Sequence, residues 1–459
     1  MGKRVAIVGA GPGGLVAAKE CLAAGLEPKV FEKSGRIGGV WAHGMWRSMR
    51  ANLSKHTCSF SDFGMRAASE FPSPGEMVSY LEEYATRFGV RACLALETEV
   101  VEVRRRGERW RVATRDGCEE FDYLCVACGI FGSPWRPNIP GAERVKQLHA
   151  REYRGDVVAG DALVVGSAFS GAEIAADLAS KGVRVACSGR TAHYYLPRLV
   201  GSVPVDLVFF DPPPTRLPTL EERHAALRKL AFDSAELLSP DTSKSPKLVI
   251  SDSFVQFVDA GAIACRSELA RFEPRDDDDA VDAVFADGRR VAVHTVIWAT
   301  GYDASGLATL LPMEVLRDLE FDQFDKLQPL VLHLQTIHPS YPSLGFVGYY
   351  RGPYFGAMEL QARLLAAIWS GAMPAPSREE QWKGCDEARR VRRGDEPGGR
   401  AQFPVDYVAH TDALARALGV GLRRGPISPS FPLRLVAYLR SVWVVLGARW
   451  RRSVCFAHS

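Results

Sequence analysis

Metal-ligand clusters, a catalytic triad and a disulfide framework are all missing from this sequence. Its ten cysteines are scattered along 459 residues, which is typical of a protein from a reducing compartment. The run of four aspartates at 276–279 fits a solvated turn better than a calcium loop, so no metal site is predicted. A formal net charge of +3 argues against a dedicated nucleic-acid binder.

Long apolar runs are missing as well. The most apolar stretch, 431–448, contains two arginines, and its uncharged part is far shorter than the roughly twenty residues that a transmembrane helix needs. We expect a packed C-terminal helix there, with contact to acidic lipid through the arginines at 449–452 as the alternative. A strand that begins at Val5 leaves no room for a signal peptide. We therefore expect a cytoplasmic protein, and a homodimer stays open.

A glycine-rich turn near the N-terminus is the most informative stretch that is present. The apolar run 5–8 predicts a buried parallel strand, and it leads directly into Gly9, Gly11 and Gly14 in a G-x-G-x-x-G pattern. A small-residue helix is expected over 15–24. Such a turn lets a pyrophosphate approach the backbone at the positive end of a helix, so the pattern predicts a dinucleotide site.

An acidic residue follows at the spacing that a dinucleotide site requires. The apolar run 28–31 predicts a second strand, and Glu32 with Lys33 ends it. This places a carboxylate about twenty residues after the glycines, where a ribose hydroxyl would lie.

The same strand, turn and helix pattern recurs in the middle of the chain. Residues 162–165 predict a buried strand, and Gly166, Ser167, Ser170 and Gly171 belong to the turn that follows it. Two such units in 459 residues indicate an α/β protein with two nucleotide sites. Ala168 stands where the pattern has its middle glycine, so its methyl group is expected to press toward a pyrophosphate.

Further segments complete a resemblance to the class B flavin-dependent monooxygenases of the flavin-containing monooxygenase type. They are Gly38-Gly39-Val40-Trp41, Asn52 in R-x-N-L-S-K, Phe60-Ser61-Asp62-Phe63, His149 with Tyr153, Trp298-Ala299-Thr300-Gly301-Tyr302 and Glu359-Leu360-Gln361-Ala362-Arg363. With the two glycine turns, these segments extend over most of the chain. The A-T-G-Y element is the most specific of them.

The resemblance implies two Rossmann-like, doubly wound domains, with the NADPH domain inserted into the FAD domain. Residues 1–155 would be the first part of the FAD-binding domain, 156–292 the NADPH-binding domain, and 293–459 the second part of the FAD domain with C-terminal helices.

The resemblance also implies the reaction. In that family, FAD is reduced by NADPH and reacts with O2 to give a C4a-hydroperoxyflavin, which a nitrogen or sulfur lone pair of a small-molecule substrate attacks. This chemistry needs a dry, pre-organised pocket rather than a strong base. Asn52 matches the pocket asparagine of the family, whose amide can both donate and accept hydrogen bonds.

The cofactor-binding residues expected on these grounds extend over both units. They are Gly9, Gly11, Pro12, Gly13, Gly14, Glu32, Lys33, Gly39, Val40, Trp41, Asn52, Gly166, Ser167, Ser170, Gly171, Ser188, Arg190, Thr300, Gly301 and Gln361. Among these, Arg190 favours NADPH over NADH, because a guanidinium matches a 2′-phosphate bidentately.

Three other enzyme classes and one non-enzymatic function are weighed against this interpretation. A Baeyer–Villiger enzyme and an N-hydroxylating monooxygenase share the motifs, and Ala168 leaves room for a flavin-bound sensor that has lost NADPH use. Cys125 and Cys128 form a C-x-x-C as in disulfide oxidoreductases. Residues three apart on a strand face opposite sides, however, which argues against a bridge between them.

Overall fold

The computed structural model describes residues 2–208, 218–276, 279–352, 354–395, 397–403 and 406–420. The apolar tail 431–448, the arginines after it, and Asp277 and Asp278 of the aspartate run lie outside the described residues. In the described part of the chain, no helix is both long and apolar enough to span a bilayer.

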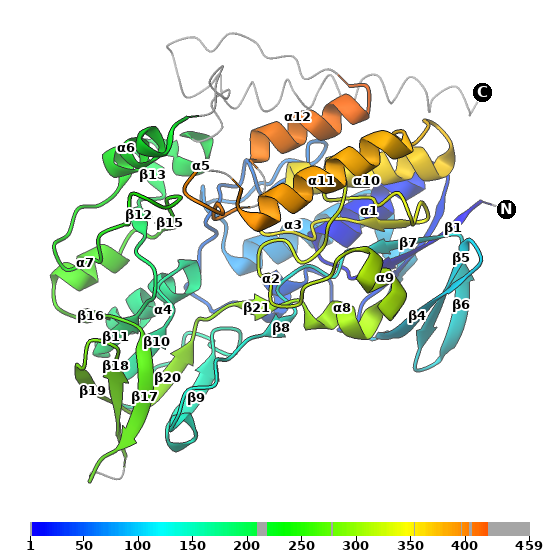
Figure 1. The fold of residues 1–459 in the computed structure, drawn as a ribbon. Helices are drawn as coiled ribbons and strands as arrows, with labels where there is room; N and C mark the ends of the chain where they lie inside the picture. The colour runs from blue at the N-terminus through cyan, green and yellow to red at the C-terminus, as the bar shows by residue number, and fades with distance from the viewer. Residues whose placement is uncertain are drawn as a thin grey trace.

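A five-stranded parallel sheet forms the centre of the first unit (Figure 1). Its order is β22-β7-β1-β2-β3, with β1 Arg4–Val8, β2 Glu27–Phe31, β3 Leu94–Ala95, β7 Tyr123–Val126 and β22 Leu344–Phe346. The predicted strands at 5–8 and 28–31 are therefore confirmed, and they are neighbours with Ile7 opposite Val30.

A second five-stranded parallel sheet repeats this plan in the other unit. Its order is β16-β11-β10-β20-β9, with β9 Lys146–His149, β10 Ala162–Val165, β11 Val185–Ser188, β16 Ile263–Arg266 and β20 Thr295–Trp298. Two parallel sheets, each with a central strand that leads into a glycine turn, confirm the expected doubly wound α/β fold.

Each parallel sheet lies between helices on one face and a three-stranded antiparallel sheet on the other. In the first unit, α1 Pro12–Ala23, α3 Pro74–Arg87 and α10 Phe355–Ser370 share one apolar core, and β4 Val100–Arg106, β5 Arg109–Thr114 and β6 Gly117–Phe121 cover the opposite face. In the second unit, α4 Phe169–Ala179 and α7 Phe254–Asp259 cover one face of the sheet. The opposite face is covered by β17 Leu269–Pro274, β18 Val281–Phe285 and β19 Arg290–Val293.

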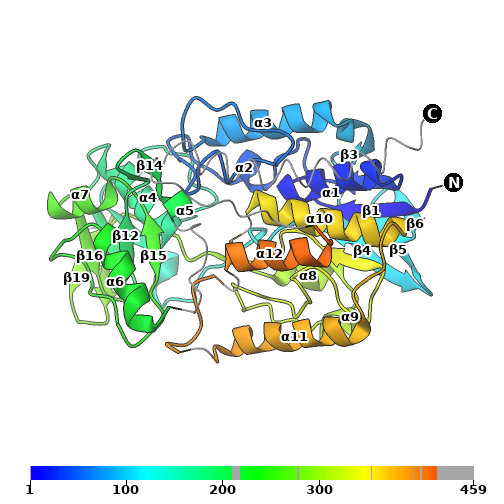
Figure 2. The same ribbon diagram turned by 90° about the horizontal axis from the view of Figure 1, so that it is seen from above.

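Shorter elements complete the described residues. The strand pairs are β8 Ser133–Pro134 with β21 Tyr302–Asp303, β12 Tyr194–Leu196 with β15 Leu248–Ile250, and β13 Leu199–Val200 with β14 Val203–Pro204. The remaining α-helices are α2 Val40–His43, α5 Val205–Val208, α6 Leu220–Leu230, α8 Ser305–Leu310, α9 Met313–Asp318, α11 Arg378–Arg393 and α12 Tyr407–Ala417. Seen from above, α10 lies between α1 and α12 (Figure 2).

The chain crosses between the two sheets twice. It leaves the first sheet after β7 and returns from β20, and the two crossing segments pair as β8 and β21, with Tyr302 opposite Pro134. Strands β9 and β20 lie in the second sheet, although the expected domain bounds at 155/156 and 292/293 place both with the first unit. A four-residue apolar strand does not itself indicate which sheet it joins.

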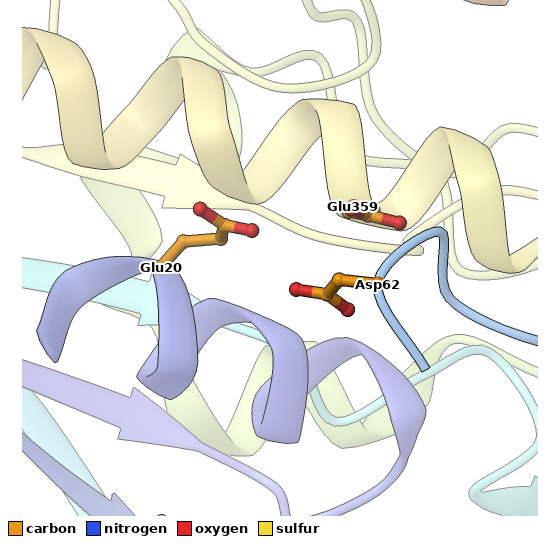
Figure 3. A group of neighbouring side chains, drawn as sticks. All are labelled: Glu20, Asp62 and Glu359. Atoms are coloured by element: carbon orange, nitrogen blue, oxygen red, sulfur yellow. The ribbon is translucent and has the colours of Figure 1, made fainter. Parts of the chain in front are cut away.

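An ion network, largely buried, connects α1 to α10 within the first unit. The carboxylate oxygens of Glu20, Asp62 and Glu359 lie within 4.8 Å of one another (Figure 3). Two cations pair with these three carboxylates: Lys19 Nζ lies 2.8 Å from Glu20 and 2.5 Å from Asp62, and Arg363 forms ion pairs with Glu20 and Glu359. The cluster is therefore an ion-pair network and carries no metal assignment.

We predict that Glu359→Leu strongly destabilises the fold. Glu359 accepts hydrogen bonds from the Ser61 backbone nitrogen at 2.8 Å and from its hydroxyl at 2.5 Å. Breaking a buried ion pair costs about 3–5 kcal/mol, whereas the matched variant Glu379→Leu removes an exposed ion pair on α11 and should cost under about 1 kcal/mol. Urea unfolding of both variants measures the difference, and equal losses would contradict this role of Glu359.

Candidate functional site

A single cavity of about 1510 Å³ opens between the two units. Drug-sized pockets hold about 300–1,000 Å³, so this cavity has room for more than one ligand. Many of the predicted site residues line it: Gly9, Gly11, Pro12, Gly13, Glu32, Lys33, Gly39, Val40, Trp41, Asn52, Ser170, Thr300 and Gly301. Residues far apart in the sequence thus meet at one site.

The first glycine turn is shaped by two contacts that only glycine permits. A Cβ on Gly14 would lie 1.8 Å from the Gly9 carbonyl oxygen, and Gly9 itself has φ +104°. Gly11 differs, because it has an ordinary φ of −77° and a Cβ there would lie 3.8 Å from the nearest atom, Gly39 Cα. Gly14 therefore serves helix packing, while Gly11 leaves the space in front of the α1 N-terminus open for a ligand.

The second turn reproduces this geometry. A Cβ on Gly171 would lie 1.6 Å from the Gly166 carbonyl oxygen, and Gly166 has φ +112°. Ala168 occupies the place of Gly11, with φ −81° and ψ −168° against −77° and −174°. The alanine is therefore unstrained, and it lines the cavity; whether its methyl group presses on a pyrophosphate stays a prediction.

Glu32 and the 38–41 segment close the first turn from outside. The Glu32 carboxylate accepts hydrogen bonds from the Ala10 nitrogen at 2.9 Å and from Ser34. The Gly38 nitrogen donates to the Ala10 carbonyl at 2.9 Å, and a Cβ on Gly39 would lie 3.2 Å from Gly11 Cα. This close approach is the physical reason for the paired glycines.

Asn52 faces the cavity with an unpaired acceptor. Its Oδ1 is buried and receives no hydrogen bond, and such a group is costly unless a ligand donates to it. The amide therefore fits a hydrogen-bonding cofactor or substrate.

Two charged residues of the second unit hold the segment that carries Asn52, and sequence reasoning missed both. The Arg198 guanidinium donates to the carbonyl oxygens of Arg50 and Ala51 at 3.3 and 3.2 Å. Asp206 accepts from the Ser54 nitrogen and hydroxyl, each at 2.9 Å. Burial raises the pKa of the Asp206 carboxyl. Isolated charges in a proline-rich region carry no motif that could have identified them.

His149 connects the A-T-G-Y element to the second sheet. The Arg151 backbone nitrogen donates to His149 Nδ1 at 3.1 Å, so Nε2 carries the proton that it donates to the Gly301 carbonyl at 3.0 Å. Burial lowers the pKa of His149 and favours this neutral form. The histidine thus positions Gly301 at the cavity wall.

Seven predicted residues do not line the large cavity. They are Gly14, Gly166, Ser167, Gly171, Ser188, Arg190 and Gln361.

Three of these seven residues, Ser188, Arg190 and Gln361, make contacts outside the large cavity. Ser188 is 2% exposed and donates its hydroxyl proton to the Ser267 carbonyl, and Arg190 is 70% exposed beside Glu268. Gln361 binds the Gly348 nitrogen and the Gln335 carbonyl, both at 2.9 Å, and so supports the cavity wall from behind.

The C-x-x-C pair does not act as a unit in this geometry. Cys125 is buried in the core of the first unit, whereas Cys128 lines the cavity, and both are free thiols. Cys128 is exposed whereas Cys125 is buried, so the two sulfur atoms do not share one environment.

Comparisons with known proteins agree with this geometry. The model of the family described as flavin-binding monooxygenase-like matches residues 2–423. Mouse "Dimethylaniline monooxygenase [N-oxide-forming] 4" is 26% identical over 97% of this chain and 82% of its own. Macaque "Flavin-containing monooxygenase 3" is 28% identical over 92% of this chain and 83% of its own.

Two solved structures show the same fold. S-allyl-L-cysteine S-oxygenase from Allium sativum superposes with a TM-score of 0.64 at 22% identity, over 99% of each chain. The open form of cyclohexanone monooxygenase has a TM-score of 0.69 at 16% identity, over 91% of this chain and 98% of its own.

We predict opposite effects of alanine at Gly11 and Gly14. Gly11→Ala should leave the apoprotein as stable or up to about 1 kcal/mol more stable, because its φ suits alanine, yet it should weaken cofactor binding. Gly14→Ala should destabilise the fold by about 1–3 kcal/mol or more, since its methyl overlaps a backbone carbonyl. Thermal unfolding of the apoproteins and bound-flavin absorbance separate the two effects. Equal destabilisation would show that both glycines serve packing.

Proposed function

The chain belongs to the flavin-binding monooxygenase-like family, and on that premise we propose the reaction that it catalyses and the residues that bind its cofactors. The protein is an FAD- and NADPH-dependent monooxygenase that transfers one oxygen atom of O2 to a small molecule. The acceptor is a soft nucleophile, nitrogen or sulfur. The observation that carries this function is the opening of two glycine turns into one cavity that also contains Asn52.

We propose that the first unit holds FAD. The N-terminus of α1 faces the space that Gly11 leaves open, which suits a pyrophosphate. Glu32 lines the cavity beside the turn, where a carboxylate can bind ribose hydroxyls. Gly39 and Trp41 would cover the cofactor from the opposite side.

NADPH is assigned to the second unit. Ala168 and Ser170 line the cavity at the N-terminus of α4, so the pyrophosphate would lie against this turn. Arg190 follows the end of β11, where the adenosine ribose and its 2′-phosphate would bind, while the buried Ser188 hydroxyl is already bound to the Ser267 carbonyl. Arg190 would exchange its 3.9 Å contact with Glu268 for that phosphate.

Asn52 is the residue that we place at the reacting centre. Bound FAD, once reduced by NADPH, supplies the activation of O2. The Asn52 amide can donate to an oxygen atom at the flavin while its unpaired Oδ1 accepts from the nicotinamide amide. Arg198 and Asp206 fix the backbone around it, so the amide is oriented before any ligand arrives.

A substrate panel tests the function. Purified holoprotein should consume NADPH and O2 with amines and sulfides and give the N-oxide or sulfoxide, with one oxygen atom traced from labelled O2. Product from ketones alone would assign a Baeyer–Villiger reaction instead. NADPH consumption without any oxygenated product would overturn a monooxygenase function.

We predict that Asn52→Ala uncouples the enzyme. Folding, FAD content and flavin reduction by NADPH should persist, because the side chain has no protein partner for its Oδ1. Losing one hydrogen bond at the reacting centre costs about 0.5–1.5 kcal/mol, and water can then occupy its place. Hydrogen peroxide per NADPH should rise and product should fall, as measured in parallel in one reaction. Unchanged coupling would remove Asn52 from the site.

A second variant tests the nucleotide assignment. Arg190→Ala should raise the Michaelis constant for NADPH about ten- to a hundredfold, because a charge-assisted contact to the 2′-phosphate is lost. The constant for NADH, which lacks that phosphate, is the internal control. Equal effects on both nucleotides would show that Arg190 does not bind the phosphate.

The cellular setting is a further proposal. We place the protein in the cytoplasm, because the nine cysteines among the described residues are all free thiols, as a reducing compartment favours. Contact of the C-terminal arginines with acidic lipid, and a homodimer, are the alternatives to a free monomer. Vesicle sedimentation and light scattering of the full chain distinguish these states.

A further inference from the structure

Arg351 is a cation that faces the cavity without a counter-ion. It lies between β22 and α10 and lines the cavity. Among the described residues, no carboxylate lies within ion-pair distance of its guanidinium, and no acceptor receives a hydrogen bond from it. The Phe403 ring, 5.9 Å from Cζ, is its cation–π neighbour. Burial lowers the pKa of Arg351, since removing a charge from water without a partner is unfavourable.

The backbone presents this guanidinium from a fixed position. The Arg351 nitrogen donates to the Leu327 carbonyl at 2.9 Å, and Gln361 holds the nearby Gly348 nitrogen at 2.9 Å. The backbone that carries this charge is therefore held in place before a ligand binds.

Two lysines make the surroundings of Arg351 positive. Burial first, then the charges of Arg190 and Arg351, lower the pKa of Lys326 to about 8. Burial and the same two arginines lower the pKa of Lys247. Asp303 is the acidic group that acts on Lys326 in the opposite direction, yet it forms no ion pair with these cations among the described residues. The region therefore favours a bound anion.

Arg351 belongs to a segment that packs against the first glycine turn and lines the cavity. Its segment begins at Val347, whose carbonyl oxygen lies 3.0 Å from the place of a Cβ on Gly13. The second turn and Arg190, which we assign to NADPH, belong to the other unit. Arg351 thus belongs to the segment that borders the site proposed for the flavin.

From this placement we propose that Arg351 binds a carboxylate on the oxygenated substrate. The substrate class is then a small thioether or amine that carries a negative charge. The inference rests on the proposed function and refines it. A guanidinium can bind a carboxylate through two parallel hydrogen bonds, and this contact would orient the nitrogen or sulfur toward Asn52.

The test uses two thioethers that differ only in charge, 4-(methylthio)benzoate and 4-(methylthio)benzamide. With the holoenzyme and saturating NADPH, kcat/KM for sulfoxide formation should favour the carboxylate about tenfold or more. Arg351→Gln should abolish this preference, chiefly by raising KM for the benzoate about ten- to a hundredfold. The rate with the benzamide should stay close to that of the parent.

Two matched variants separate substrate from nucleotide. Arg400→Gln removes another cavity-lining guanidinium, but one that already lies 2.9 Å from Asp325, and the preference should persist. Arg190→Ala should affect NADPH without changing the preference. Arg351→Lys keeps the charge without the planar fork, so it should retain part of the preference, and it replaces the glutamine variant if that variant loses flavin.

Binding of the benzoate is also followed without turnover, through the change that it causes in flavin absorbance of the oxidised enzyme. Arg351→Gln should weaken this binding by the same factor as KM. The proposal would be overturned if Arg351→Gln left the preference for the benzoate unchanged and raised the KM for NADPH. The anion that Arg351 binds would then be a nucleotide phosphate. A parent enzyme that oxygenates both thioethers equally would overturn it too. If neither thioether is oxygenated, the substrate panel decides on the proposed function, and the binding titration still decides on Arg351.

Discussion

The contact between a helix and the turn that precedes it is the constraint on which the rest of the structure depends. Gly14 sits so close to the Gly9 carbonyl that no other residue fits, and Gly171 repeats this against Gly166. Each contact sets a helix N-terminus directly over the end of a parallel strand. The N-termini of α1 and α4 then both face one cavity, and this cavity can bind a nucleotide at each N-terminus.

Residues of both units line the cavity, and charged side chains connect the two units beside Asn52. Asn52 lies on the first unit, but Arg198 and Asp206 of the second unit bind the backbone on either side of it. Glu359 fixes the segment around Ser61 from the other side through the buried ion network. The orientation of one amide therefore depends on contacts that join elements far apart in the sequence.

Sequence alone could predict those parts of the site that are local. A strand, a glycine turn and a helix are contiguous, so the turns at Gly9 and Gly166 follow from residue order. Sheet membership is not local, and β20 was assigned to the wrong side of a domain boundary because its sheet partners are distant. Asp206 and Arg351 were missed for the same reason, since an isolated charge shows its role only when its neighbours are known.

The distribution of charge in the cavity suits an oxygenation that uses no strong base. A nucleophilic nitrogen or sulfur supplies its own electron pair, so the protein must place it and exclude water. Groups without partners are then the informative ones, because a folded chain satisfies nearly all of its buried polar atoms. Asn52 keeps a free acceptor at the cavity wall. Arg351 keeps a free cation on the wall, and the structure holds that unfavourable charge ready for a ligand that neutralises it.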